Sequence, residues 1–179
     1  MRALLDANVL YPAVLRTALL SLGRAGWLTP LWSPRILAEW AVVAARRGED
    51  AGDAVAAARA AFPEAGILPP PDLEATLSLP DRGDLHVLAA AIAGGADAIV
   101  TANLRDFPAR ALAAHGILRR DPDGLLLEAL DDAPAAAEAA LTEAHALAER
   151  LSGRTLSPRA VLKRAGLPRT AKRRPGLPE

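Results

Sequence analysis

The segment DLHVLAAAIAGGADAIVTANLRDF, residues 84–107, decides the fold class of this chain of 179 residues. The stretch LHVLAAAIAGG predicts a helix that begins after Asp84 and ends at Gly94–Gly95, since glycine is common just beyond a helix end. The run AIV at 98–100 predicts a strand covered on both faces. A helix followed directly by such a strand is typical of proteins with a parallel sheet.

The flanking sequence continues the alternation of strands and helices. RALLDA at residues 2–7 predicts another buried strand, and residues 116–118 predict a short edge strand. Three consecutive prolines indicate a loop over residues 66–80. Helices are expected over residues 12–22, 34–47, 51–62, 109–116 and 121–130. We therefore predict an α/β domain over residues 1–130, with a parallel sheet and helices on both faces.

Residues 131–179 are expected to form a helical, basic extension. Residues 1–149 carry 12 Lys and Arg against 20 Asp and Glu, a net charge of −8, whereas residues 150–179 carry 9 against 1, a net charge of +8. Such a basic end is either a solvated terminus or a surface that attracts RNA phosphates or an acidic partner, and homodimerisation would bring the opposite charges together. The residues expected to make these contacts are Arg159, Lys163, Arg164, Arg169, Lys172, Arg173 and Arg174.

Several classes of site are excluded by what the sequence lacks. There is no cysteine, which rules out disulfides, thiolate zinc sites and cysteine nucleophiles. Neither a phosphate-binding glycine loop followed by lysine nor a G-x-S-x-G motif is present, and His86, His115 and His145 do not have metal-ligand spacing. No apolar run reaches the roughly 20 residues of a membrane span, and no signal peptide is recognisable at the start. We expect a cytoplasmic protein without membrane contacts.

The remaining candidates for chemistry are carboxylates. Asp6 follows the first expected strand, and the carboxyl ends of parallel strands border the ligand crevice of open α/β sheets. Glu39 lies near the apolar stripe of an expected helix, Asp84 precedes another helix, and Asp106 follows the second strand. Each also has a plain structural explanation: a turn or helix cap for Asp6 and Asp84, an ion pair for Glu39, and a loop for Asp106.

The combination of these segments is more specific than any one of them. LLDANVL at residues 4–10, ILAEW at 36–40 and the block at 84–107, in this order and spacing, resemble the PIN-domain ribonucleases. That family includes the VapC-like toxins of bacterial toxin–antitoxin pairs. The resemblance covers about residues 2–130 and implies that the protein is a metal-dependent endoribonuclease that acts on RNA, with an antitoxin protein as partner.

The resemblance also implies which residues form the site. The catalytic acids would be Asp6, Glu39, Asp84 and Asp106, with Asn103 as the alternative at the fourth position and Asp6 and Asp84 as direct metal ligands. Asn8, Asp81, Thr101 and Asn103 would line the site. Converging carboxylates repel one another unless a cation intervenes, and oxygen ligands suit Mg²⁺ or Mn²⁺. Such an ion activates water for phosphodiester hydrolysis, so that no protein nucleophile is needed.

Three other interpretations compete with this one. A PIN fold could bind RNA or a partner without cleaving it, and metal-dependent turnover would separate the two. A haloacid-dehalogenase-type phosphatase also has an Asp after its first strand, but it needs a second Asp where Asn8 stands and a catalytic lysine, which residues 1–149 lack. An alanine-rich scaffold whose acids are all helix caps would have no reason to place them in this order.

Overall fold

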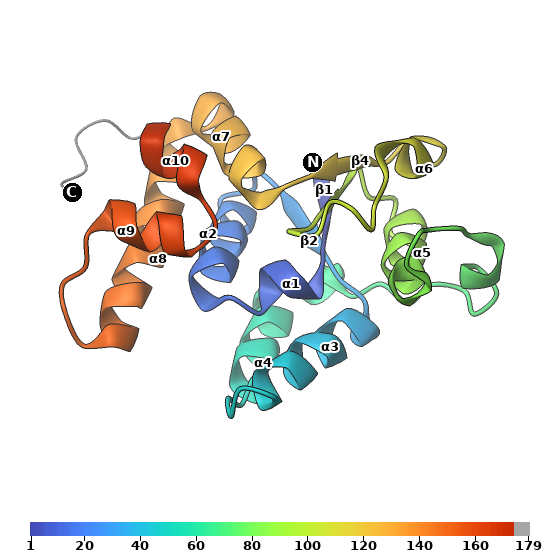
Figure 1. Cartoon of the computed structure of the whole chain (residues 1–179), viewed down its shortest axis with the longest axis horizontal. Coiled ribbons are helices and arrows are strands. Elements are labelled where there is room, and N and C mark those ends of the chain that lie inside the picture. Colours follow the sequence, from blue (N-terminus) through green and yellow to red (C-terminus); the bar gives the residue numbers. More distant parts are fainter. Residues whose placement is uncertain (174–179) are drawn as a thin grey trace. The chain divides into compact units, whose positions relative to one another are not determined.

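The computed structural model describes residues 1–173, which form two compact units (Figure 1). The sheet unit comprises Met1–Tyr11 and Leu28–Asp121. The helical unit comprises Pro12–Trp27 and the residues from Pro122 onward. Arg174 lies outside the described residues, so its predicted contact with RNA or a partner stays a prediction.

The sheet unit is built on four parallel strands in the order β2-β1-β3-β4. Their bounds are β1 (Arg2–Leu5), β2 (Thr29–Leu31), β3 (Ala98–Val100) and β4 (Leu118–Arg120). Leu4 in the central strand β1 pairs with Leu31 on one side and Ile99 on the other, and all three are fully buried. Apolar strands of this kind need cover on both faces. The predicted parallel α/β fold is confirmed.

Helices and short 3₁₀ turns connect the strands of the sheet unit. They are α1 (Ala7–Leu10), α3 (Pro34–Ala45), α4 (Gly52–Ala61), η1 (Pro63–Ala65), η2 (Glu74–Thr76), η3 (Arg82–Asp84), α5 (Leu85–Ala93) and α6 (Ala109–Ala113). The predicted start of α3 is confirmed, because the Ser33 hydroxyl accepts a hydrogen bond from the Ile36 amide at 3.2 Å.

The turn from α5 to β3 explains why the deciding segment contains two glycines. A Cβ atom on Gly94 would lie 3.0 Å from Ile67 Cγ1 and 3.1 Å from Leu31 Cδ1, so a side chain there would push the helix away from the sheet. Gly95 has φ +57°, a left-handed conformation that glycine adopts at little cost. The chain can therefore reverse at once and enter β3.

Two strands differ from the sequence prediction. Strand β2 was not predicted, because it is three residues long and contains Pro30; it lies at the edge of the sheet, where a missing amide donor is tolerated. The edge strand predicted at 116–118 was placed too early. Gly116 has φ +71° and belongs to the turn after α6, and β4 begins at Leu118.

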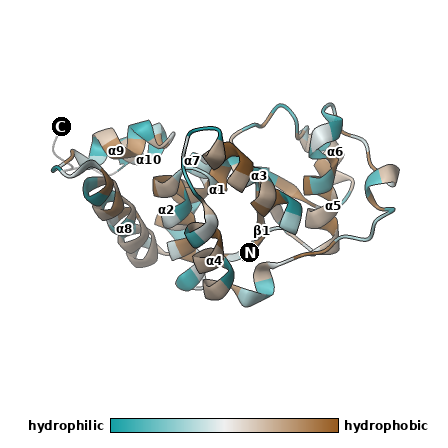
Figure 2. Ribbon diagram, turned by 90° about the horizontal axis from the view of Figure 1, so that it is seen from below, coloured by the Kyte–Doolittle hydropathy of each residue, from teal (hydrophilic) through white to brown (hydrophobic). Residues whose placement is uncertain are grey.

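The helical unit consists of α2 (Ala13–Arg24), α7 (Pro122–Asp132), α8 (Pro134–Ser152), α9 (Pro158–Arg164) and α10 (Pro168–Arg173). In Figure 2 the ribbons of α9 and α10 change between teal and brown, as short helices with one charged and one apolar side should. The predicted boundary after residue 130 falls in the last turn of α7. An extension over residues 131–179 as a separate domain remains a prediction.

One buried carboxylate holds α10 against α7. Asp123 is 4% exposed, and its Oδ1 accepts hydrogen bonds from the Thr170 hydroxyl at 2.7 Å and the Thr170 amide at 2.9 Å. Its Oδ2 accepts the Arg169 amide at 2.8 Å. Asp123 therefore binds amides in the first turn of a helix that is too short to be stable alone.

Candidate metal centre

The carboxyl ends of β1 and β3 bring Asp6 and Thr101 together. Asp6 is 6% exposed, and its Oδ2 accepts hydrogen bonds from Thr101 Oγ1 at 2.8 Å and Asn8 Nδ2 at 2.6 Å. Asn8 also accepts the Ala102 amide at 2.9 Å through Oδ1. The predicted lining residues Asn8 and Thr101 thus fix the orientation of the Asp6 carboxylate.

Asp6 is nevertheless held in an unfavourable environment. Burial raises the pKa of Asp6 above its ordinary value, and the hydrogen bonds from Thr101 and Asn8 offset this only in part. A buried carboxylate whose pKa remains raised lacks a compensating positive charge.

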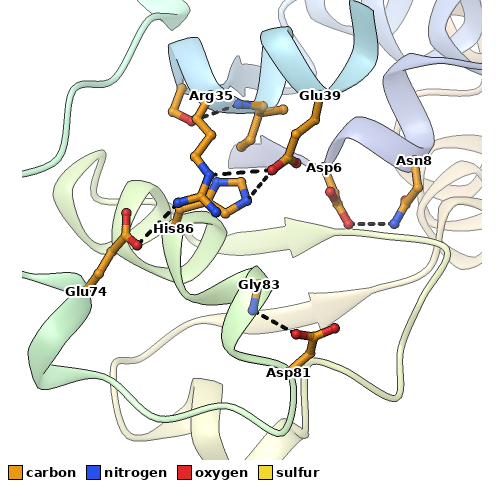
Figure 3. A network of polar contacts seen from close by, with 10 residues as sticks. Asp6, Asn8, Arg35, Glu39, Glu74, Asp81, Gly83 and His86 are labelled. Atoms are coloured by element: carbon orange, nitrogen blue, oxygen red, sulfur yellow. Dashed lines mark hydrogen bonds and ion pairs between the residues drawn. The ribbon is translucent and has the colours of Figure 1, made fainter. Parts of the chain in front are cut away.

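A second group of carboxylates forms an acidic triad. Asp81, Asp84 and Asp106 each supply one oxygen, and these three atoms all lie within 4.8 Å of one another. Asp81 Oδ1 accepts the Gly83 amide at 2.7 Å, which folds the loop so that it enters α5 (Figure 3). Asp84 stands at the start of α5, yet its side chain makes no capping hydrogen bond. The structural explanation of Asp84 as a helix cap therefore does not hold.

Asp106 and Asn103, the two candidates for the fourth catalytic position, contact each other. The side-chain Nδ2 of Asn103 donates a hydrogen bond to Asp106 Oδ2, and the backbone N–H of Asn103 donates to Thr101 Oγ1 at 3.0 Å. The carboxylate of this pair belongs to the triad. Asn103 therefore connects the triad to the Asp6 network, and the choice between Asp106 and Asn103 at the fourth catalytic position stays a prediction.

Electrostatics link the two groups of acids. The pKa of Asp84 is raised to about 6, first by burial and then by the negative charges of Asp6, Asp106, Asp81 and Glu39, in that order. The other three predicted catalytic acids and Asp81 therefore all act on the Asp84 carboxylate. Asp6 was predicted as a direct metal ligand with Asp84. The three-oxygen cluster contains Asp84 but not Asp6, so this role of Asp6 stays a prediction.

Glu39 extends from α3 and contacts two side chains, His86 and Arg35. Its Oε1 lies 2.9 Å from His86 Nε2 and 3.6 Å from Arg35 Nε (Figure 3). Arg35 in turn lies 3.5 Å from a carboxylate oxygen of Glu74. Burial raises the pKa of Glu39, and Arg35 lowers it in part. The predicted ion pair with Arg35 is present, but His86 makes the shorter contact.

His86 is the residue of this site that the sequence did not indicate. It is 2% exposed in the first turn of α5, where the residues that follow it are apolar. A histidine in such a helix needs a polar partner, but the sequence alone does not show which side chain supplies one. The sequence feature that could have indicated His86 as part of the site is its position two residues after Asp84.

The oxygen atoms of the triad fit a divalent metal ion. Hard cations prefer carboxylate oxygens, whereas zinc sites draw mainly on nitrogen and sulfur. Burial and then the neighbouring negative charges raise the pKa of Asp84, and a bound cation would favour its ionised form. The acidic triad could therefore hold such an ion.

The basic residues predicted to bind RNA or a partner all belong to the helical unit. Arg159, Lys163 and Arg164 lie on α9, and Arg169, Lys172 and Arg173 lie on α10. Two of them already contact acids: Arg169 Nε lies 3.3 Å from Asp123 Oδ2, and Arg173 pairs with Asp131. Within the described part of the chain, no helix has the length and apolar character of a membrane span.

Comparison with known proteins shows to which family the chain belongs. Neither curated proteins nor solved structures gave a significant match. The family model described as PIN domain matches residues 2–105, which include Asp6, Glu39 and Asp84 and end one residue before Asp106. The match spans more than half of the chain, and the chain therefore belongs to the PIN-domain family.

Proposed function

We propose that this protein is a metal-dependent endoribonuclease that hydrolyses phosphodiester bonds of RNA with Mg²⁺ or Mn²⁺. The observation that supports this is the Asp84 carboxylate, whose pKa is raised to about 6 by burial and by four neighbouring acids. PIN domains are generally nucleases, and the acids of this chain lie on the matched segment or next to it. RNA as the substrate rests on the resemblance to the PIN-domain ribonucleases.

The residues that would hold the ion are Asp81, Asp84 and Asp106, with Asp6 as a further ligand directly or through water. When bound, Mg²⁺ or Mn²⁺ lowers the pKa of water and offsets negative charge on phosphate oxygens. Asn8 and Thr101 hold Asp6 in place. Fixed ligands of this kind cost little reorganisation when the substrate binds.

Hydrolysis also requires a proton acceptor near the attacking water. The water oxygen forms a bond to phosphorus, one P–O ester bond breaks, and the departing oxygen takes up a proton. Glu39 suits the role of orienting this water and accepting its proton, because its side chain is 40% exposed and its carboxylate is held by His86 at 2.9 Å.

The physiological role that we propose is that of the toxin in a toxin–antitoxin pair. In this proposal the protein works in the cytoplasm as a homodimer, and a small antitoxin protein inhibits it. Induced expression should arrest growth, Asp6→Asn should remove the arrest, and co-expression of the neighbouring reading frame should relieve it. Growth arrest that persists in the Asp6→Asn variant would contradict the toxin role.

The nuclease activity is tested with purified full-length protein and a labelled RNA of mixed sequence. Cleavage should require Mg²⁺ or Mn²⁺ and stop with EDTA, and Asp84→Asn should reduce it by about 100-fold or more. The matched control is Asp53→Asn, the same chemical change in the first turn of α4 at an exposed position. Isothermal titration with Mn²⁺ measures ion binding separately from activity.

The outcomes separate the alternatives. RNA binding without metal-dependent products would favour a PIN fold that binds without cleaving. Cleavage that is equal in EDTA, or unchanged in Asp84→Asn, would contradict the metal mechanism.

A further inference from the structure

The helical unit contains an apolar groove of about 360 Å³ that the proposed nuclease activity does not use. Its walls come from the start of α2, the end of α8, and α9, which all belong to this unit. Val14, Leu156 and Val161 contribute apolar surface, and no aromatic residue lines it.

The groove has an exposed hydrophobic edge. Leu151 at the end of α8 lines it with 68% of its surface exposed. Ala160, which is also exposed, continues the apolar lining on α9. Apolar surface in a concave site of this size is typical of a binding site.

One positively charged residue lies within this apolar lining, and a second is its neighbour on α9. Arg164 lines the groove, and Lys163 lies beside it on α9. No ion pair joins Arg154, Lys163 or Arg164 to an acid within residues 1–173. The nearest acid in the sequence, Glu149, accepts the Leu156 amide at 3.0 Å. From residue 150 to 173 the chain has basic residues and no acidic one.

We propose that this groove binds an amphipathic helix of a partner protein, whose apolar face enters the groove and whose flanking Asp and Glu residues meet the cations. Apolar floors with charged rims bind helices in this way, with side chains at i, i+3, i+4 and i+7 as anchors. Opposite charge at the rim speeds association and selects the partner. The proposal is independent of the nuclease activity.

Two other occupants fit less well. Single-stranded RNA binds through aromatic stacking along a basic path, and no aromatic ring lines this groove. A second copy of this chain would need a helix with an exposed apolar stripe. The large hydrophobic residues exposed in residues 1–173 are Met1, Val42, Leu68, Leu118 and Leu151, and no two of them lie on the same helix.

The test uses full-length protein and three fluorescent synthetic peptides of about five helical turns. The first carries Leu on one face and Glu on the others, the second has the same composition in scrambled order, and the third has Lys in place of Glu. Fluorescence anisotropy should show that the first peptide binds about tenfold more tightly than either of the others. Equal binding of the scrambled or the Lys peptide would overturn the proposal.

Variants locate the binding site. Ala160→Trp fills the groove, and Arg164→Glu reverses the charge on its rim; each should weaken binding of the first peptide by about tenfold. Arg110→Glu makes the same charge reversal on α6 of the sheet unit and should have little effect. Circular dichroism melting checks that each variant is folded. Binding that is unaffected by both groove variants would overturn the proposal.

The other occupants give distinct results. If Ala160→Trp abolishes binding of an oligouridine while the peptide does not bind, the groove serves RNA. If light scattering shows a dimer that Ala160→Trp dissociates, the groove holds a second copy. Either result would overturn the proposal. Metal-dependent cleavage by Ala160→Trp is expected to be retained, so failure of the groove and failure of the nuclease are separable.

Discussion

His86 Nε2 lies 2.9 Å from Glu39 Oε1, so a buried imidazole on α5 donates a hydrogen bond to a half-exposed carboxylate on α3. The other ring nitrogen, Nδ1, is buried without a hydrogen-bond partner within residues 1–173. A protonated ring would bury an unsatisfied N–H donor there, which is costly. His86 is therefore neutral, with its proton on Nε2.

The first prediction concerns the charge of His86. Its pKa is lowered from 6.5 to about 4, by burial first and by Arg35 second. The unfolded chain takes up a proton between these values and the folded protein does not, so stability falls as the pH drops through this range. Nitrogen NMR of the folded protein should show the neutral Nε2–H tautomer near pH 6. An imidazolium spectrum at that pH would refute the assignment.

The second prediction tests His86 as a positioning residue. His86→Leu removes the donor to Glu39, and kcat should fall by about tenfold or more, with KM little changed. His86→Gln, whose amide can donate in place of the imidazole, should recover part of kcat. Steady-state kinetics measure both variants. If Leu and Gln behave alike, the hydrogen bond to Glu39 does not matter for the reaction.

The third prediction concerns Asp84 and pH. The pKa of Asp84 is raised to about 6, so the folded protein without metal holds a proton on it that the unfolded chain releases near pH 4. This contribution to stability is present below about pH 4 and is lost as the pH rises through about 6. Bound metal requires the ionised carboxylate, so metal affinity should fall below about pH 6.

Thermal melting with and without Mn²⁺ checks this dependence. The metal should raise Tm at about pH 8 and have little effect at about pH 5. Asp84→Asn should raise Tm of the metal-free protein at about pH 8, because it removes one of several repelling charges. A metal effect of equal size at both values would exclude Asp84 as a ligand.

The sequence indicated the acids of the site better than their arrangement. Asp6, Glu39 and Asp84 stood out as carboxylates at a strand end, beside an apolar helix stripe and at a helix start, but only the resemblance to the PIN-domain ribonucleases named them together as catalytic acids. Asp81 was expected only to line the site, and its grouping with Asp84 and Asp106 could not be predicted because it depends on how the loop before α5 bends. The bend comes from a hydrogen bond between Asp81 and the Gly83 amide at 2.7 Å.

The strand that could not be predicted from the sequence likewise depends on contacts between distant segments. Strands β1 and β3 were predictable because each is a short, continuous apolar run, the pattern of a strand buried on both faces. Strand β2 depends on pairing with β1, which places Pro30 opposite Ala3. No local feature of Thr29–Leu31 predicts a strand, and this segment is extended because it pairs with β1.

The fourth prediction concerns the support of Asp6. Thr101 is fully buried, and its hydroxyl donates to Asp6 at 2.8 Å while accepting Asn8 Nδ2 at 2.9 Å. Thr101→Val keeps the shape and removes these bonds, which should lower the free energy of unfolding by about 1–3 kcal/mol. Thr142→Val is the matched control, because its hydroxyl is exposed and donates to the Glu138 carbonyl at 2.8 Å. Urea titration measures both, and equal losses would show that the Asp6 network adds no stability.

The fifth prediction concerns the docking of α10. Burial raises the pKa of Asp123, but the hydrogen bonds from Thr170 and Arg169 lower it by a larger amount. The pKa of Asp123 therefore lies below its ordinary value. Stability from Asp123 is therefore present above its ordinary pKa near 4 and is lost as the pH falls through the lower, folded value.

Asp123→Ala should expose the amides that this carboxylate binds. Its removal should cost about 3 kcal/mol, because four hydrogen-bond donors of Arg169 and Thr170 lose a charged acceptor. Asp131→Ala removes a carboxylate that is 56% exposed and paired with Arg173, and should cost less than about 1 kcal/mol. Hydrogen exchange at the amides of Arg169 and Thr170 should speed up in Asp123→Ala and stay slow in Asp131→Ala. Slow exchange in both would mean that the apolar contacts of α10 hold it in place without Asp123.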